Sequence, residues 1–312
     1  MSIKVKKLPI IKQLISLLSN IKLPWLYGLS LYELLSLYVT GIIEGALSYR
    51  AAAIAFSFFM ALFPFTLFIL NLIPYIPIQG FQQDFLEFIR EGVPPNTYDA
   101  IYKIINDILN NSYNSLLSTG FIMSIFLMTN GVNAILGGFE NSQHILLKRK
   151  YFHQYFVSLA ISVLLSFLLV ITIATIVVFE VFIQKTKIQD VLSDAIPLIE
   201  WSRYIFLILM ILITTSILFK FGTKHDGGRR AFISIGSVFT TILIILSSYL
   251  FGIWAVKFSK YNQLYGSIGT LLVIMFYIWI NCMILLLGFE LNAIIQKLKR
   301  EKAKELEAQS IT

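Results

Sequence analysis

The last long apolar segment constrains the fold more than any other part of the sequence. No charged side chain lies between Lys260 and Glu290. These ~29 residues would extend ~43 Å as an α-helix, which exceeds the ~30 Å hydrocarbon core of a bilayer. A segment of this length and polarity is typical of a transmembrane helix, so the sequence predicts an integral membrane protein.

The composition of the whole chain agrees with this prediction. Of its 312 residues, 57% are hydrophobic and 13% are charged. Soluble globular domains carry about a quarter charged residues, because their surfaces must face water. The expected fold class is therefore all-α, a polytopic membrane protein.

Five further apolar segments precede the last one. Together with it they predict six transmembrane helices, at residues 51–73, 116–139, 155–183, 201–221, 231–256 and 264–295. Residues 48–296 thus form a membrane domain, and residues 297–312 form a charged cytoplasmic tail. Pro64 lies inside the first span, where it removes a backbone donor, so we expect a kink there.

The N-terminal segment, residues 1–47, precedes the first span. Lys12 and Gln13 interrupt its first apolar run, so we expect no cleaved signal peptide. Apolar residues recur at helical spacing at 10–21 and again at 31–47, which predicts two amphipathic helices. We expect both to lie along the cytoplasmic face of the membrane. Packing as ordinary cytosolic helices is the alternative.

The distribution of basic residues predicts the orientation. Most of the 25 Lys and Arg residues lie before the first span, at 148–150, at 220–230 and after Glu290. Basic loops stay in the cytoplasm, so the positive-inside rule places both termini there. Contact of these loops with anionic lipid headgroups accounts for the net charge of +8 without a nucleic-acid partner.

Four segments in order resemble the YihY/BrkB family of bacterial inner-membrane proteins. They are AAAIAFSFFMALFPFTLFIL in the first span, STGFIMSIFLMTNGVNAILGGF in the second, and YNQLYGSIGTLLVIMFYIW and LLLGFELNA in the sixth. The resemblance covers about residues 34–296. It implies a six-span protein of the bacterial inner membrane with cytoplasmic termini and no settled activity. Family members once carried the label ribonuclease BN, now regarded as a misassignment, and one branch is linked to serum resistance.

The chain departs from the pattern expected of that family at two places. Ser234, Ile235 and Gly236 stand where a Pro-Gly pair is expected at the start of the fifth span. This departure weakens the expectation of a kink there. Phe289 stands where alanine is usual, which suggests looser packing around Glu290.

The sequence shows no pattern of a catalytic site. Its three histidines, His144, His153 and His225, lack the spacing of a metal site, and its acidic residues are scattered through loops. The single cysteine, Cys282, lies within an apolar helix, which excludes a CxxC metal or redox site. We therefore expect no enzymatic activity, no metal and no cofactor.

Polar side chains within the second and sixth spans are the first candidate functional residues. They are Asn130, Asn133, Tyr277, Asn281 and Asn292. The last three share one face of the sixth helix with Gly288, at about 100° per residue. They line a polar path between helices, or they form interhelical hydrogen bonds worth about 0.6 kcal/mol each. We favour the second interpretation.

Two carboxylates are the remaining candidates. Glu290 is expected near a helix C-terminus, where the dipole disfavours negative charge, so it needs a basic partner. The candidate partners on the cytoplasmic side are Arg50, Lys148 and Arg230. The leading interpretation is a structural ion pair, and a proton-coupled role is the alternative. Glu180, near the outer end of the third span, raises the same two interpretations with Lys185 as its neighbour.

Two functional hypotheses follow from these features. A transporter or exporter of an envelope-related or lipid-like substrate is favoured by the polar residues in the spans and by the proline in the first. A non-transporting envelope scaffold is favoured because the sequence shows neither paired intramembrane charges nor an inverted repeat. Membrane lipids are the expected partners, and a homo-oligomer or an envelope protein partner fits either hypothesis.

Overall fold

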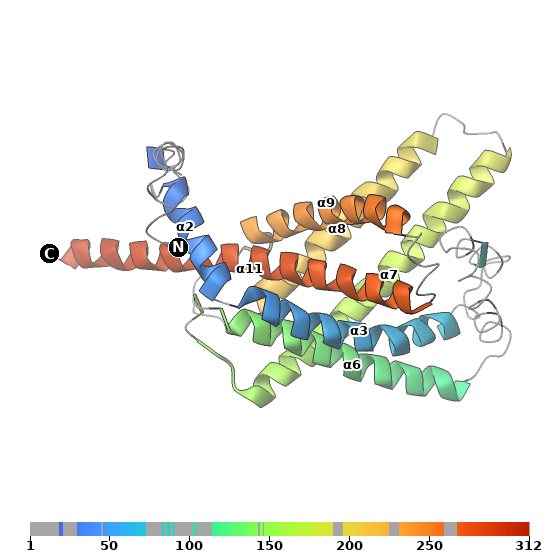
Figure 1. Cartoon of the computed structure of the whole chain (residues 1–312), viewed down its shortest axis with the longest axis horizontal. Coiled ribbons are helices and arrows are strands. Elements are labelled where there is room, and N and C mark those ends of the chain that lie inside the picture. Colours follow the sequence, from blue (N-terminus) through green and yellow to red (C-terminus); the bar gives the residue numbers. More distant parts are fainter. Residues whose placement is uncertain are drawn as a thin grey trace.

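The computed structural model is helical and shows no β-strand over the residues that it describes. These are residues 19–20, 30–44, 46–72, 83, 86–87, 90, 102, 106, 114–142, 144–145, 147–189, 196–224, 231–258 and 267–311. The long helices are α2 (Leu31–Glu44), α3 (Leu47–Leu72), α6 (Asn114–Glu140), α7 (Tyr151–Gln189), α8 (Ile196–Phe221), α9 (Ile235–Phe258) and α11 (Ser267–Ile311) (Figure 1). All but α2 are long and apolar enough to cross a membrane, which confirms the six predicted spans.

Two helices extend well beyond the predicted spans. Helix α7 has 39 residues and α11 has 45. The segment predicted as a separate tail, 297–312, continues α11 without a break as far as Ile311, because its Lys, Glu and Ala residues are good helix formers. Helix α3 likewise continues through Pro64 to Leu72. The kink at Pro64 stays a prediction.

Helix α2 corresponds to the second predicted amphipathic helix, although it ends at Glu44 rather than at residue 47. The chain then turns at Ala46, whose φ of 45° lies in the left-handed region that often ends helices. The first predicted amphipathic helix, residues 10–21, lies outside the described residues except for positions 19–20. The location of either segment at the membrane surface stays a prediction.

Helix α2 packs against α11. Leu37 and Tyr38 lie against Ile294 and Ile295 of α11. The Tyr38 hydroxyl also donates a hydrogen bond to the Leu287 carbonyl at 3.0 Å. Helix α2 is thereby held on the outside of the six-helix domain, at the end from which the C-terminal half of α11 projects (Figure 1).

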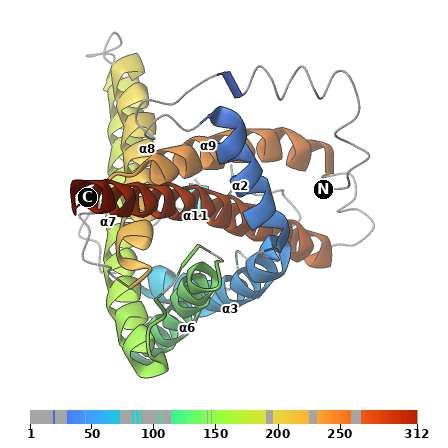
Figure 2. The same ribbon diagram turned by 90° about the vertical axis from the view of Figure 1, so that its left-hand side faces the viewer.

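The six spanning helices form a ring in the order of the chain. Helix α3 packs on α6, α6 on α7, α7 on α8, α8 on α9, and α11 packs on both α9 and α3. Figure 2 shows these helices from the side of the molecule on which the C-terminal end of α11 lies. Each helix therefore lies beside its neighbours in sequence, and α11 closes the ring against α3.

The ring is packed much more tightly at one end than at the other. We call the tightly packed end the closed end. Helices α3, α7 and α9 begin there, and helices α6 and α8 end there. Buried side chains gather at this end, for example Ala51 in α3, Leu136 in α6 and Leu286 in α11, each 0% exposed. Farther along the same helices, most described side chains are half-buried or exposed.

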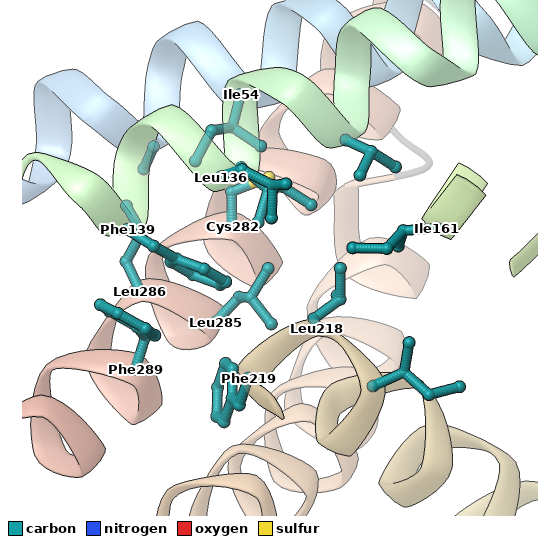
Figure 3. Close-up of a cluster of buried hydrophobic side chains, with 14 of the residues drawn as sticks. Ile54, Leu136, Phe139, Ile161, Leu218, Phe219, Cys282, Leu285, Leu286 and Phe289 are labelled. Carbon is teal, nitrogen blue, oxygen red and sulfur yellow. The ribbon is translucent and has the colours of Figure 1, made fainter. Parts of the chain in front are cut away.

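Aromatic rings fill the centre of the closed end (Figure 3). Phe139 of α6 stacks on Phe289 of α11, with ring centroids 4.0 Å apart, and Phe219 of α8 meets both rings edge-on. Phe289 is only 3% exposed. The expectation of looser packing around Glu290 was therefore wrong, because the phenyl ring that stands in place of alanine fills the space between three helices.

Candidate functional site: a buried ion pair and a central cavity

A buried ion pair crosses the closed end of the ring. Arg50 Nη2 of α3 donates to Glu290 Oε1 of α11 at 2.6 Å, and the two side chains are 8% and 1% exposed. The second carboxylate oxygen, Oε2, accepts a hydrogen bond from the Ser142 hydroxyl at 2.7 Å. Both oxygens of Glu290 are thus paired, as a buried charge requires.

Arg50 also ties α3 to the end of α6. Its Nη1 donates to the Gly138 carbonyl at 2.7 Å. Gly138 lies in the last turn of α6, where carbonyls lack an intrahelical partner. One guanidinium therefore joins α3, α6 and α11, which is the planar two-sided bonding that arginine provides and lysine does not.

Of the three predicted partners of Glu290, Arg50 is the one that pairs with it. Lys148 instead donates to Asn141 Oδ1 at 3.3 Å, and Arg230 lies outside the described residues. The expected reason for the pairing was wrong, however. Glu290 lies in the interior of α11 rather than near its C-terminus, so burial, not the helix dipole, demands the partner.

The pair also corrects an observation that favoured the scaffold hypothesis. Arg50 and Glu290 both lie within candidate membrane spans, Leu47–Pro64 and Leu271–Glu301. Paired charges are therefore present within the spanning helices. The sequence named Arg50 as one of three candidate partners but could not select it, because the two residues are 240 positions apart.

His144 lies beside this pair, in the connection between α6 and α7. A Cβ placed on Gly41 of α2 would lie 2.9 Å from His144 Nε2 and 3.8 Å from Glu290 Oε2. Both ring nitrogens of His144 are buried and lack a hydrogen-bond partner. Burial is the main reason that the pKa of His144 lies below its ordinary value, and it outweighs the opposing effect of Glu290.

A second arginine holds the end of α8 at the same side of the ring. Arg149 donates to the carbonyls of Phe221, Gly222 and Thr223 at 2.8, 3.0 and 2.8 Å. Its backbone N–H donates to Glu140 Oε1 at 3.2 Å. These bonds satisfy carbonyls at the C-terminus of α8 and join it to the connection between α6 and α7.

The predicted polar face of the sixth span is largely the face that α11 turns to α9. Tyr277 and Ser248 share a hydrogen bond of 2.7 Å between their hydroxyls. Asn292 accepts from the Gly236 N–H at 2.9 Å and donates to the Ser234 hydroxyl at 2.6 Å. These contacts match the helix-packing interpretation of the stripe.

Close backbone approach underlies the same contact. A Cβ on Gly288 would lie 1.7 Å from Thr240 Oγ1, and one on Gly236 would lie 2.3 Å from the Gly288 carbonyl. The helices can cross here only because both positions are glycine. Ser234, in the segment where the family resemblance implies a Pro-Gly pair, caps α9 through reciprocal bonds with Ser237.

The two asparagines of the second span are placed apart from this face. Asn133 accepts a hydrogen bond from the Ser158 hydroxyl of α7 at 3.3 Å. A further bond of 2.9 Å joins Thr129 and Ser162, so polar side chains link α6 to α7. Asn130 lies half-buried on α6. Asn133 and Asn292 thus contact different helices, and a shared polar path stays a prediction.

Asn281 has a different environment. Its Nδ2 donates to the Tyr277 carbonyl of its own helix at 2.8 Å. The same side chain lines a cavity of about 440 Å³ inside the ring. Such a volume lies within the ~300–1,000 Å³ of sites that hold small molecules.

All six spanning helices line this cavity. Phe58 of α3, Met128 of α6, Leu168 of α7, Met210 of α8, Ile244 of α9 and Cys282 of α11 are among the lining residues. Ile135, Leu218 and Leu285, which belong to the core of the closed end, line it as well. The tightly packed end is therefore the floor of the cavity.

The described lining is apolar apart from a few uncharged groups. These are the side chains of Thr172, Thr214, Thr215, Tyr277 and Asn281. Such a surface suits a hydrocarbon chain and would leave an ionised group without a counter-charge. Within the described part of the chain, no three His, Cys, Asp or Glu residues lie close enough together to hold a metal ion.

Glu180 is the remaining predicted candidate. It lies within α7, and its side chain is outside the described residues. Its pairing with Lys185 stays a prediction.

The fold and the site define a multi-pass α-helical membrane protein with a central apolar cavity above a buried ion pair. The chain belongs to the virulence factor BrkB family, whose sequence profile matches residues 39–312. This membership confirms the family resemblance.

Curated relatives support the same assignment. The ribonuclease-like protein YfkH of Bacillus subtilis (strain 168) is 29% identical over 256 residues, which cover 80% of this chain and 90% of that protein. A UPF0761 membrane protein of Coxiella burnetii (strain Dugway 5J108-111) is 23% identical over 256 residues, covering 81% and 89%. One from Aggregatibacter aphrophilus (strain NJ8700) is 22% identical over 273 residues, covering 85% and 92%. No solved structure matches the chain.

Proposed function

We propose that this protein transports an envelope-related, lipid-like substrate and holds its apolar chain inside the helix ring. The observation that carries the proposal is the cavity of about 440 Å³ that all six spanning helices line. A ring that served only to anchor or to scaffold would gain stability by closing such a space, because an empty cavity forfeits packing contacts.

The chemistry of the lining supports a lipid chain rather than an ion or a sugar. Its described residues carry no charge, and the amide of Asn281 and the hydroxyl of Tyr277 are its larger polar groups. A charged headgroup in this space would lose its hydration without gaining a counter-charge. The headgroup is therefore expected to remain at the membrane face while the chain occupies the cavity.

Transport in this scheme requires the closed end to open. The floor of the cavity is sealed by Leu136, Leu286 and the phenylalanine cluster, and it is tied across by Arg50 and Glu290. A substrate chain that enters from the wider part of the ring can leave at the closed end only if these contacts separate. The ion pair is thus proposed as a gate.

A matched pair of variants on α8 tests transport. Met210 lines the cavity, whereas Leu209 beside it is 48% exposed on the outside. In vesicles containing the purified protein and fluorescent phospholipids or isoprenoid lipids, Met210→Trp should abolish protein-dependent lipid movement and Leu209→Trp should preserve it. Equal rates for both variants would contradict the proposal.

The scaffold hypothesis has its own supporting observation. Tyr277, Gly288 and Asn292 of the sixth span are all engaged with α9, so this polar face holds helices together. Absence of lipid movement in the wild-type vesicles, together with specific capture of a second envelope protein or of another copy of the chain, would favour that hypothesis.

The proposed location is the bacterial inner membrane, with both termini in the cytoplasm and no enzymatic activity. The basic loops at 148–150 and 220–230 support this orientation. Reporter fusions after Lys150 and at Thr312 should then read cytoplasmic, and a fusion at Asp190 should read external. A cytoplasmic reading at Asp190 would overturn the proposed topology.

A further inference from the structure

His144 is a titratable side chain with buried ring nitrogens, and the transport proposal leaves it without a role. It lies in the connection between α6 and α7, two positions after Ser142. The Ser142 hydroxyl donates a hydrogen bond to Glu290 Oε2. Both of its ring nitrogens are buried without a hydrogen-bond partner. An unpaired buried imidazole costs stability, so its presence beside the gate calls for an explanation.

The imidazole and the carboxylate of Glu290 both approach Gly41 of α2. The position of a Cβ on Gly41 would be 2.9 Å from His144 Nε2 and 3.8 Å from Glu290 Oε2. The absence of a side chain at Gly41 therefore makes room for the ring. Any change in the charge of the ring acts directly on the carboxylate that ties the closed end together.

We propose that His144 is the proton acceptor that releases the closed end, so that acidification on its side of the membrane opens the gate. The inference rests on the proposed transport function only for the purpose of the opening, which would be to release the substrate. The opening itself is a property of the apoprotein and can be measured without a substrate.

The charge balance of the closed end explains the direction. The negative charge of Glu290 is already matched by Arg50, and its second oxygen is occupied by Ser142. A proton on His144 would add an unmatched positive charge at ring nitrogens that are shielded from solvent. Buried unmatched charge is costly, so the protonated ring favours an arrangement in which water can solvate it.

The charged groups around the imidazole act in both directions, and desolvation decides the sign. Glu290 and Glu301 of α11 favour the protonated ring, whereas Lys297 of the same helix disfavours it. Arg50 of α3 adds a nearby positive charge, and Tyr38 of α2, also coupled to Glu290, has a pKa raised above its ordinary value mainly by burial. Desolvation is the largest effect on His144 and lowers its pKa.

The sign of the pH dependence follows from linkage. In the closed form the pKa of His144 is depressed, and in an open, hydrated form it would return to about 6.5. The open form therefore binds the proton more tightly. Above about pH 6.5 the ring is neutral in both forms, and the closed form is favoured. Below that pH, the ratio of closed to open protein falls by up to about a factor of ten per pH unit, until the pH reaches the depressed pKa of the closed form.

Cysteine accessibility at the closed end measures the opening. Ala293, which is 3% exposed, is replaced by cysteine in a Cys282→Ser background that removes the single native cysteine. The rate of reaction with a water-soluble methanethiosulfonate reagent is divided by the rate at an exposed reference, Ala308→Cys in the same background. The same ratio in His144→Phe and His144→Gln controls for the pH dependence of the thiol itself.

The expected result is a ratio that rises several-fold between about pH 7.5 and about pH 5.5 in the protein that retains His144, and that stays flat in both His144 variants. A flat ratio with His144 present would overturn the inference. An equal rise of the ratio in His144→Phe or His144→Gln, in whichever of these variants folds, would also overturn the inference. Failure of lipid movement in vesicles would not alter either result, so the two proposals fail separately.

Discussion

Phe139 and Phe289 lie face to face at the closed end of the ring, with their planes 8° apart and their centroids separated by 4.0 Å. They come from α6 and α11, which otherwise contact each other little because α3 lies between them in the ring. Phe219 packs against both phenyl groups. The three side chains form the centre of the tightly packed core at the closed end, whereas the rest of the helix ring is packed more loosely.

Truncation of this stack should destabilise the fold strongly. Phe139→Ala removes a fully buried ring and should lower the free energy of unfolding by about 3–5 kcal/mol. Phe126→Ala on the same helix removes a ring that is 51% exposed and should have a much smaller effect. Thermal unfolding in detergent compares the two variants. Equal losses would mean that the stack does not form the core of the closed end.

The Arg50–Glu290 pair should show strong coupling in a double-mutant cycle. Glu290→Gln leaves the buried guanidinium without a counter-charge and should cost about 3–5 kcal/mol of unfolding free energy. Arg50→Met should cost a similar amount, and the double variant should cost less than the sum of the two. Equilibrium unfolding in mixed micelles provides the measurement. Strictly additive losses would refute the pairing, and normal stability of Glu290→Gln with altered pH dependence would favour a proton-coupled role for the carboxylate.

The crossing of α9 and α11 should tolerate no side chain at Gly288. In Gly288→Ala the new methyl group would overlap Thr240 Oγ1, since a Cβ there lies 1.7 Å from that atom. The helices must then separate, so the variant should melt at a lower temperature. Gly252→Ala on α9 is the control, because a Cβ at that glycine meets no atom within 4 Å. A normal melting temperature for Gly288→Ala would show that this close contact does not exist.

Two asparagines on α11 should respond differently to the same substitution. Asn292→Leu removes both hydrogen bonds to the start of α9 and should cost about 1–2 kcal/mol of stability. Asn281→Leu removes only a bond within its own helix and should cost about 0.6 kcal/mol or less, while it alters a group that faces the cavity. Unfolding and lipid-movement assays on both variants distinguish a loss of helix packing from a loss of substrate contact. The idea that Asn281 faces a substrate fails if its loss reduces stability as much as that of Asn292 and leaves lipid movement unchanged.

The sequence predicts the spans and one helix face but not how the ring closes. Hydrocarbon thickness dictates the length of an apolar segment, so the six spanning helices follow from composition alone. The stripe of Tyr277, Gly288 and Asn292 follows from helical periodicity, although periodicity does not say which helix it meets. The neighbour proves to be α9.

Long-range contacts set the limit of prediction from the sequence. Arg50 could be named among three partners for Glu290, but only the fold selects it. Ser142 and His144 were missed because they lie in a connection 148 and 146 positions from Glu290 and carry no motif. The dipole argument for Glu290 failed because α11 does not end where its apolar part ends.

The cavity is the central feature of the proposed function, and native mass spectrometry of the purified protein tests it most directly. The wild-type protein should retain one lipid that resists removal by detergent, and the mass of that lipid would distinguish acyl from isoprenoid chains. Met210→Trp, which fills the cavity, should lose the lipid, while Leu209→Trp on the outer face should keep it. A wild-type protein free of lipid, or equal retention by the two variants, would contradict a lipid-binding cavity.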